Sequence, residues 1–283
     1  MIRVRRLVPA VGLVPFLGFL TIFLLIPTVT VVVGAFVEND KPSLSNIRAL
    51  GSAVVMRTLW HSVVLSGSTA VLGALLGALL AYCVVTGKPD GVLRKSVMSA
   101  SSVLAQFGGV TLAFAFIATL GFSGVVTQAA RDTLGLDLFG SGWLFSLTGL
   151  ILVYTYFQIP LMVIVFLPSL DGMRVQWREA AESLGASTWQ FWRYVAGPLL
   201  LPAFLGSALL LFANAFAAYA TAAALVSQGS PIMPLLIRNA LTSEVVLGQA
   251  HLAYALALDM IIVVVVVMAL YTVMVRRTSR WLR

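Results

Sequence analysis

Few side chains of this sequence could act in catalysis, and their spacing does not bring them together. There are two histidines, His61 and His251, and one cysteine, Cys83, which lies inside an apolar run. One cysteine excludes a disulfide within the chain and a cysteine-based zinc site, so we interpret Cys83 as a buried, inert thiol. The Gly-Lys pair at 87–88 is followed by proline, whereas a phosphate loop needs Ser or Thr there. The sequence indicates no metal centre, no ATP site and no enzyme.

Four polar residues fall inside apolar segments. Asp259 is the one acidic residue well inside a hydrophobic run, where a carboxylate is costly and is by default a functional candidate. It could attract a cationic substrate or hold a gate, or it could be neutral or pair with a polar group such as Asn214. Gln106, Gln158 and Asn214 could line a substrate pathway or hydrogen-bond between helices.

A polar segment from Glu179 to Ser187 lies between two long apolar runs and could dock onto a partner. Good helix formers precede Gly185, and the spacing of Trp177, Ala181 and Leu184 predicts that they share one helical face. Gly185 permits a left-handed or otherwise unusual backbone turn that would end this helix.

A second short helix is predicted after that turn, capped by Ser187 or Thr188 and carrying Trp189 and Trp192. Pro198 fits the first turn of the following membrane helix. The alternative interpretation is an amphipathic interfacial helix that only connects two spans, with its aromatic residues at headgroup depth. The residues alone do not separate these two interpretations.

The composition decides the class of protein. The chain has 283 residues, of which 60% are hydrophobic and 10% charged, and its mean hydropathy is +1.01. Soluble domains carry about a quarter charged residues, so we predict an all-α, polytopic membrane protein. Six windows are long enough to span a bilayer: Leu7–Val37, Ser62–Val85, Val97–Leu120, Trp143–Leu170, Leu199–Val226 and Leu252–Val275. The first is too long for a signal-peptide core, and Pro15 and Pro27 predict kinks in it.

The distribution of basic residues predicts the orientation. With both termini in the cytoplasm, 13 of the 18 Lys and Arg residues fall on the cytoplasmic side. The net charge of +8 is therefore a topology signal and indicates no nucleic-acid partner. The outer connections at 38–61, 121–142 and 227–251 are long enough to hold local helices. We find no internal repeat, which disfavours a secondary transporter built from inverted halves, and we treat residues 1–283 as one permease domain.

The polar segment resembles the cytoplasmic coupling motif of binding-protein-dependent ABC importer permeases. That motif is Glu-Ala-Ala, three residues, Gly, nine residues, then Ile-x-Leu-Pro. Here Glu179-Ala180-Ala181 and Gly185 match in full, while Val195-Ala196-Gly197-Pro198 has Val for Ile and Gly for Leu. The resemblance covers about 61–275, with 171–197 as the coupling-helix loop, and includes Tyr154, Pro160 and Pro202. It favours the polyamine, sulfate, phosphonate and iron branches.

The resemblance implies a type I importer fold and a set of roles. Glu179 would pair with a basic residue of a cytoplasmic ATPase, which binds ATP and Mg²⁺ while this chain binds no cofactor. Ala180 and Ala181 would allow close approach, Gly185 would set the angle between the two short helices, and Pro198 would begin the membrane helix.

The same resemblance implies three protein partners in a bacterial cytoplasmic membrane: an ATPase dimer, a second permease subunit, identical or related, and an extracytoplasmic substrate-binding protein. Asp259 favours a polyamine-like cation as the substrate. The alternatives are an ATP-independent secondary carrier or channel, which would not need a coupling helix, and a membrane-embedded enzyme, for which we find no converging catalytic residues.

Overall fold

The computed structural model describes residues 13–38, 41–87, 91–140, 142–226, 232–242 and 249–279. The predicted all-α class is confirmed, apart from a two-residue antiparallel pair between β1 (Val37–Glu38) and β2 (Lys41–Pro42). The described residues contain six helices long and apolar enough to cross a membrane, as predicted. These are Leu13–Ala35, Ala53–Val85, Gly109–Leu134, Leu147–Asp171, Thr188–Ala217 and His251–Val275. Many of the predicted basic topology residues, including Arg3, Lys88 and Arg283, lie outside the described residues.

The chain forms two compact units, and the single domain expected over 1–283 stays a prediction. The first comprises residues 1–57 and 236–263. It holds a π-turn, η1 (Thr21–Leu25), then α2 (Ile26–Ala35) and α3 (Ser45–Ala49), together with the first part of α14 (Gln249–Ser279). Tyr254 of α14 packs its ring against Gly34, and His251 Nδ1 lies 3.3 Å from the Gly34 carbonyl oxygen.

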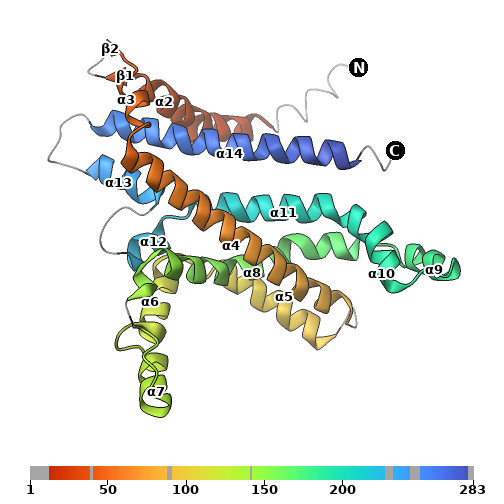
Figure 1. The fold of residues 1–283 in the computed structure, drawn as a ribbon. Coiled ribbons are helices and arrows are strands. Elements are labelled where there is room, and N and C mark those ends of the chain that lie inside the picture. Colours follow the sequence, from red (N-terminus) through yellow and green to blue (C-terminus); the bar gives the residue numbers. More distant parts are fainter. Residues whose placement is uncertain are drawn as a thin grey trace, which may run out of the picture. The chain divides into compact units, whose positions relative to one another are not determined.

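The second unit, residues 58–235 and 264–283, is built around α8 (Leu147–Asp171). Both α5 (Val92–Leu104) and α11 (Gly197–Ala217) pack on α8 (Figure 1). α8 is apolar on all sides and is the most buried of the six membrane-spanning candidates, as expected for a helix in the centre of a bundle. The other elements of this unit are α6 (Gly109–Leu120), α7 (Val125–Leu134), η2 (Trp143–Phe145), α9 (Val175–Ser183), α10 (Thr188–Phe191), η3 (Trp192–Ala196) and α12 (Ala220–Leu225). The division between the units falls within α4 (Ala53–Val85), most of which lies in the second unit, and within α13 (Met233–Thr242), most of which lies in the first.

α4 approaches α8 closely because two glycines leave room for it. A Cβ atom at Gly73 would lie 2.5 Å from the Cβ of Gln158, and one at Gly77 would lie 2.5 Å from the Cβ of Met162. Lipid tails are as apolar as leucine, so close van der Waals packing of this kind, and not hydrophobic burial, holds membrane helices together.

Two predicted spans have the wrong bounds. The window Val97–Leu120 straddles an interruption at residues 105–108, after which α6 and α7 run across the direction of α8 and α11 (Figure 1). The window Leu199–Val226 also contains a break, because α11 ends at Ala217 and α12 begins at Ala220. Cys83, predicted to be buried, is exposed on α4.

Both π-turns end two residues before a proline. η1 precedes Pro27, and η3 precedes Pro198. Proline lacks an N–H and its ring clashes with the carbonyl four residues earlier, and a π-turn shifts the hydrogen-bond register just before that point. The kinks predicted at Pro15 and Pro27 stay predictions, although the helix is irregular just before Pro27.

Candidate functional site: the α9–α10 loop and polar residues at membrane depth

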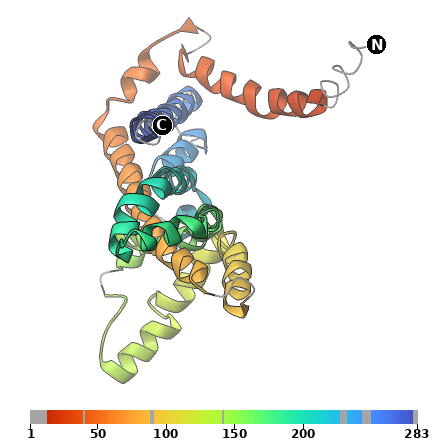
Figure 2. The ribbon, with the colours of Figure 1, turned by 90° about the vertical axis from the view of Figure 1, so that its right-hand side faces the viewer.

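The predicted helix–glycine–helix segment is present and projects from the second unit. α9 and α10 lie beyond the ends of α4, α5 and α8 in Figure 1, and they are nearest the viewer in Figure 2. α9 covers Val175–Ser183, within the predicted range. The loop begins after α8 ends at Asp171, but no break separates α10 from the membrane helix, because η3 and α11 follow it directly.

The turn between α9 and α10 is fixed by backbone hydrogen bonds. Gly185 has φ +77°, the left-handed conformation predicted for it. Its N–H donates to the Glu182 carbonyl oxygen at 2.9 Å, and the N–H of Ala186 donates to that of Ala181 at 3.0 Å. These two bonds form a Schellman motif, the common way to end a helix at a left-handed glycine.

A capping box starts α10. The Gln190 N–H donates to the Ser187 hydroxyl oxygen at 3.3 Å, and the Ser187 N–H donates to Gln190 Oε1 at 2.7 Å. Each side chain thus satisfies a backbone donor of the first turn. Of the two predicted caps, Ser187 is therefore the residue used.

The Glu-Ala-Ala motif divides between the surface and the interior of the loop. Glu179 and Ala180 are exposed, whereas Ala181 is buried against Phe191 and Ala196. Trp177, Ala181 and Leu184 were predicted to share one helical face, and this is wrong for Leu184. α9 ends at Ser183, and the Leu184 side chain is 87% exposed. The surface offered to a partner therefore includes Glu179 and Ala180, while Ala181 joins the two short helices.

Charged contacts support the loop at its surface and its base. Arg178 Nε donates to Glu182 Oε1 at 2.9 Å on α9, and this hydrogen bond raises the pKa of Arg178. At the base, Arg94 makes two hydrogen bonds to the Asp171 carboxylate, at 3.0 and 2.5 Å. This bidentate pair joins the beginning of α5 to the end of α8 and suits the planar guanidinium.

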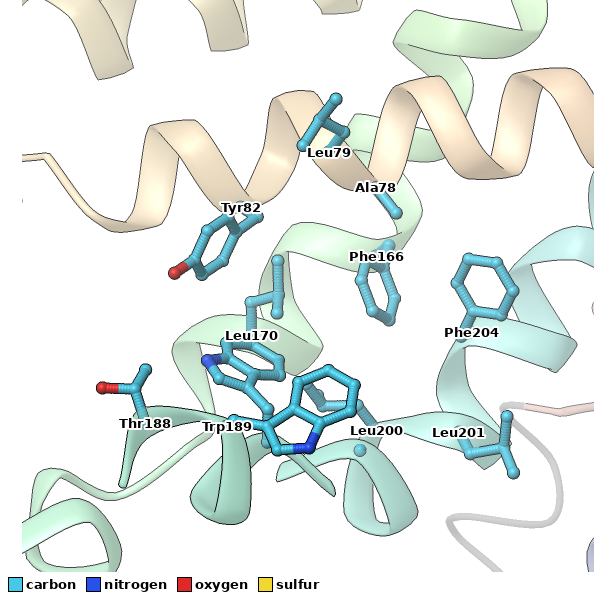
Figure 3. Close-up of a pocket in the computed structure, with 12 residues that line it drawn as sticks. Ala78, Leu79, Tyr82, Phe166, Leu170, Thr188, Trp189, Leu200, Leu201 and Phe204 are labelled. Atoms are coloured by element: carbon cyan, nitrogen blue, oxygen red, sulfur yellow. The ribbon is translucent and has the colours of Figure 1, made fainter. Parts of the chain in front are cut away.

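An apolar pocket of about 700 Å³ lies behind α10, between α4, α8 and α11. Figure 3 shows the hydroxyl groups of Tyr82 and Thr188 at one end and the side chains of Phe204 and Leu201 at the other. The Tyr82 ring also meets the Trp192 indole edge-on, with centroids 5.2 Å apart. Trp192 therefore packs against the membrane helix α4 as well as against Phe191 of the loop.

The four predicted polar residues have different environments. Gln158 is fully buried, and its Nε2 donates to the Leu211 carbonyl oxygen at 2.7 Å, which supports inter-helix hydrogen bonding for this residue. Gln106 is exposed in the turn that follows α5. Asn214 is exposed on α11 and lines a cavity of about 210 Å³.

Asp259 lies on α14, in the first unit, whereas Asn214 lies in the second. Asp259 is partly buried, and its Oδ2 has no hydrogen-bond partner among the described residues. Its predicted alternatives, a substrate contact or a pairing with Asn214, stay predictions. No group of three or more His, Cys, Asp or Glu side chains within the described part of the chain could hold a metal ion.

Some polar contacts were missed by the sequence interpretation. The Gly109 N–H donates to Thr221 Oγ1 at 2.9 Å, and the Tyr154 hydroxyl donates to the Ala218 carbonyl oxygen at 2.8 Å. Gly108-Gly109 was an available signal for the first helix break. The second lies in an alanine-rich stretch with no turn residue, so only its tertiary contacts identify it.

The described part of the chain thus combines six helices of membrane-spanning length with an ordered helix pair that projects beyond them. The chain belongs to the family described as "Binding-protein-dependent transport system inner membrane component", whose profile matches residues 6–280. It is therefore an ABC importer permease subunit.

Named relatives agree with this family. The chain is 28% identical over 190 residues to the thiamine transport system permease protein ThiP of Haemophilus influenzae, which covers 62% of this chain and 34% of ThiP. It is 29% identical over 177 residues to the molybdenum transport system permease protein ModB of Escherichia coli K12, covering 60% and 72%. The ThiP match thus spans about a third of that relative.

The fold also matches a solved importer. A chain of a bacterial alginate ABC transporter, in complex with its alginate pentasaccharide-bound periplasmic protein, superposes with a TM-score of 0.75. The match is 19% identical and covers 96% of this chain and 95% of that one. This similarity confirms the predicted importer-permease fold.

Proposed function

We propose that this chain forms a substrate pathway through the membrane together with a second permease subunit, and that α9 and α10 couple this pathway to a cytoplasmic ATPase. The observation that carries the proposal is the α9–α10 loop: its position beyond the membrane helices, its fixed turn at Gly185, and its exposed Glu179 and Ala180. The role of this chain is then transport, and ATP and Mg²⁺ would be bound by the partner.

The contacts of the loop favour its moving as one body. The Schellman turn, the capping box and the buried contact of Ala181 with Phe191 leave α9 and α10 little freedom relative to each other. α10 continues through η3 into α11, so a displacement of α10 by the ATPase would be passed directly to a membrane helix. Coupling of this kind requires an element with two arrangements, whose equilibrium is shifted both by nucleotide on the ATPase and by the loaded binding protein on the other side.

The orientation follows from this proposal. The loop would lie in the cytoplasm, which places the connections near residues 38–61, 121–142 and 227–251 on the outer side, where a substrate-binding protein would dock. Each of these connections contains a local helix, namely α3, α7 or α13, that such a partner could contact.

For the substrate we propose a polar solute, and the matches do not narrow this class further. Relatives are named for thiamine and for molybdenum, and the superposed importer for alginate. These names cover both cationic and anionic compounds, so they give the polyamine-like cation expected from Asp259 no specific support. Specificity would reside largely in the binding protein.

Co-purification tests the coupling. The chain is tagged, expressed with its partner subunits, and extracted in mild detergent, as is a Glu179→Lys variant. We expect a stoichiometric ATPase with the unchanged chain and much less with the variant, which reverses the charge of an exposed residue without disturbing the fold. An Arg174→Ala variant serves as the control, because Arg174 also lies in the loop but outside the motif. A chain that purifies alone, and transports without ATP, would favour a carrier or channel instead.

A further inference from the structure

Two interrupted helices meet inside the second unit. α5 and α6 are separated at residues 105–108, and α11 and α12 at residues 218–219. The two interruptions are joined by the hydrogen bond from the Gly109 N–H to Thr221 Oγ1. The Tyr154 hydroxyl ties the second interruption to α8 through the Ala218 carbonyl oxygen. Both breaks are therefore held in place by contacts between elements and are part of the packed structure.

The cavity of about 210 Å³ lies between these breaks. Phe157, in its wall, is close to the middle of α8, roughly 15 to 20 Å from either end at about 1.5 Å per residue. The cavity is therefore near the middle of α8, a helix long and apolar enough to cross a membrane. Its volume equals about seven water molecules at about 30 Å³ each, which is enough for a small solute or for one group of a larger one.

The wall of the cavity can form hydrogen bonds but carries no charge. Its polar side chains are Asn214, Tyr219 and Thr221, and the other residues that line it are Ala105, Gly108, Gly109, Phe157, Ala218 and Ala220. The Asn214 side chain makes no hydrogen bond within the described part of the chain. A polar amide at this depth is costly without a partner, so it needs water, a solute or a partner subunit beside it.

We propose that this cavity is a contact point on the transport pathway, where Asn214 and Thr221 bind an uncharged, hydrogen-bonding group of the passing solute. This inference rests on the proposed transport function and names the contact within it. The Thr221 oxygen already accepts a hydrogen bond, so its own proton can be donated to the solute. A fully charged group would lose its hydration here and find no opposite charge in the wall, which disfavours an ion pair as the means of recognition.

Cysteine accessibility tests the proposal without knowledge of the solute. The complete importer is prepared with Cys83→Ser, and Asn214→Cys is then introduced. Two methanethiosulfonate probes are applied in membrane vesicles, one cationic (ethyltrimethylammonium) and one anionic (ethylsulfonate). Both react with the thiolate form, which requires water. Ala215→Cys is the matched control, because the neighbouring residue is 2% exposed and packs in the apolar core.

We expect Asn214→Cys to react at least about tenfold faster than Ala215→Cys, since only the first faces a polar cavity. Corrected for their reactivity with a free thiol, the two probes should agree within about threefold, because no charged side chain lines the cavity. Vanadate trapping with ATP should change the rate, as alternating access requires.

Two results would overturn the inference. One is equal, slow labelling at the two positions, which would mean that Asn214 is covered by lipid or by the second permease. The other is a preference of tenfold or more for one probe, which would mean a charged site. Binding-protein-stimulated ATP hydrolysis by the same vesicles separates the two levels. If stimulated hydrolysis is present but position 214 is not labelled, only the inference about the cavity is wrong. If stimulated hydrolysis is absent in the unsubstituted complex, the proposed function is wrong.

Discussion

At the scale of single residues, Gly185 sets the geometry of the α9–α10 loop. Its φ of +77° is one that residues with a side chain rarely adopt, and a Cβ there would meet no other atom within 4 Å. The demand for glycine is therefore conformational and not steric. A residue that tolerates the left-handed region should replace it at little cost.

A matched pair of substitutions separates these effects. Gly185→Val should distort the turn, at about 1–2 kcal/mol for a left-handed residue with a side chain, and should lower ATPase stimulation by the binding protein. Gly185→Asn should retain most of it, because asparagine accepts this conformation. Stimulated ATP hydrolysis by the assembled complex is the measurement. Equal loss in both variants would point to close contact of a partner with the glycine instead.

Sequence reasoning at this scale succeeded where a residue acts through its own backbone. The left-handed Gly185 and the cap at Ser187 follow from residue type. The burial of Ala181 beside an exposed Ala180, and the exposure of Leu184, do not, because they depend on how α10 folds back against α9. The exposed Cys83 shows the same limit, since an apolar run does not reveal which side of a membrane helix is packed.

The Glu38 carboxylate predicts a local dependence on pH. Hydrogen bonds from Ser45 and Ser43 hold the pKa of Glu38 below the usual 4.5. Because the folded-state pKa is lowered, its stabilising effect is present above pH 4.5 and is lost as the pH falls through the lowered value. Hydrogen exchange over residues 37–49 should therefore quicken, relative to intrinsic rates, only in acid. Ser45→Ala should move this change to higher pH; an unchanged midpoint would contradict the assignment.

At the scale of elements, close packing of α4 on α8 should be sensitive to single methyl groups. Gly73→Ala places a Cβ 2.5 Å from Gln158 Cβ, and overpacking of this kind costs about 1–3 kcal/mol. Gly67→Ala on the same helix meets nothing within 4 Å and should be neutral or stabilising by up to about 1 kcal/mol. Thermal unfolding in detergent measures both, and a drop of equal size in the two variants would refute the packing argument.

The Arg94–Asp171 ion pair links α5 to α8, and exchanging its two residues should restore this link. Both side chains are partly exposed, so the pair should contribute only about 0.5–1 kcal/mol after screening by solvent. Arg94→Asp and Asp171→Arg should each lower the unfolding temperature, and the double exchange should restore part of the loss. A double-mutant cycle with no coupling between the two positions would show that the pair has no role.

The number of membrane helices was predictable because apolar runs of bilayer length are explicit in the sequence. The helix breaks were only partly predictable from the sequence. Gly108-Gly109 offers flexibility before α6, but Ala218 and Tyr219 follow good helix formers, and their break is stabilised by Tyr154 and Thr221 from other elements. Local propensity is overridden there by hydrogen bonds between elements.

At the scale of the whole molecule, α11 connects the ordered α9–α10 loop to the polar cavity, because it continues from α10 and carries Asn214 near its end. A permease that couples ATP hydrolysis to solute movement needs such a connection, because the two sites must bias the same element. The central claim is that the exposed surface of α9 meets the ATPase.

Site-directed photocrosslinking tests that claim most directly. A benzophenone amino acid replaces Ala180 in the complete importer, and in a control it replaces Val265, which is exposed on the membrane helix α14. After irradiation, adducts are identified by mass spectrometry. We expect a major adduct between position 180 and the ATPase, and no ATPase adduct from position 265. Labelling of position 180 by lipid alone, with no ATPase adduct in a complex that contains the ATPase, would contradict the coupling role of α9.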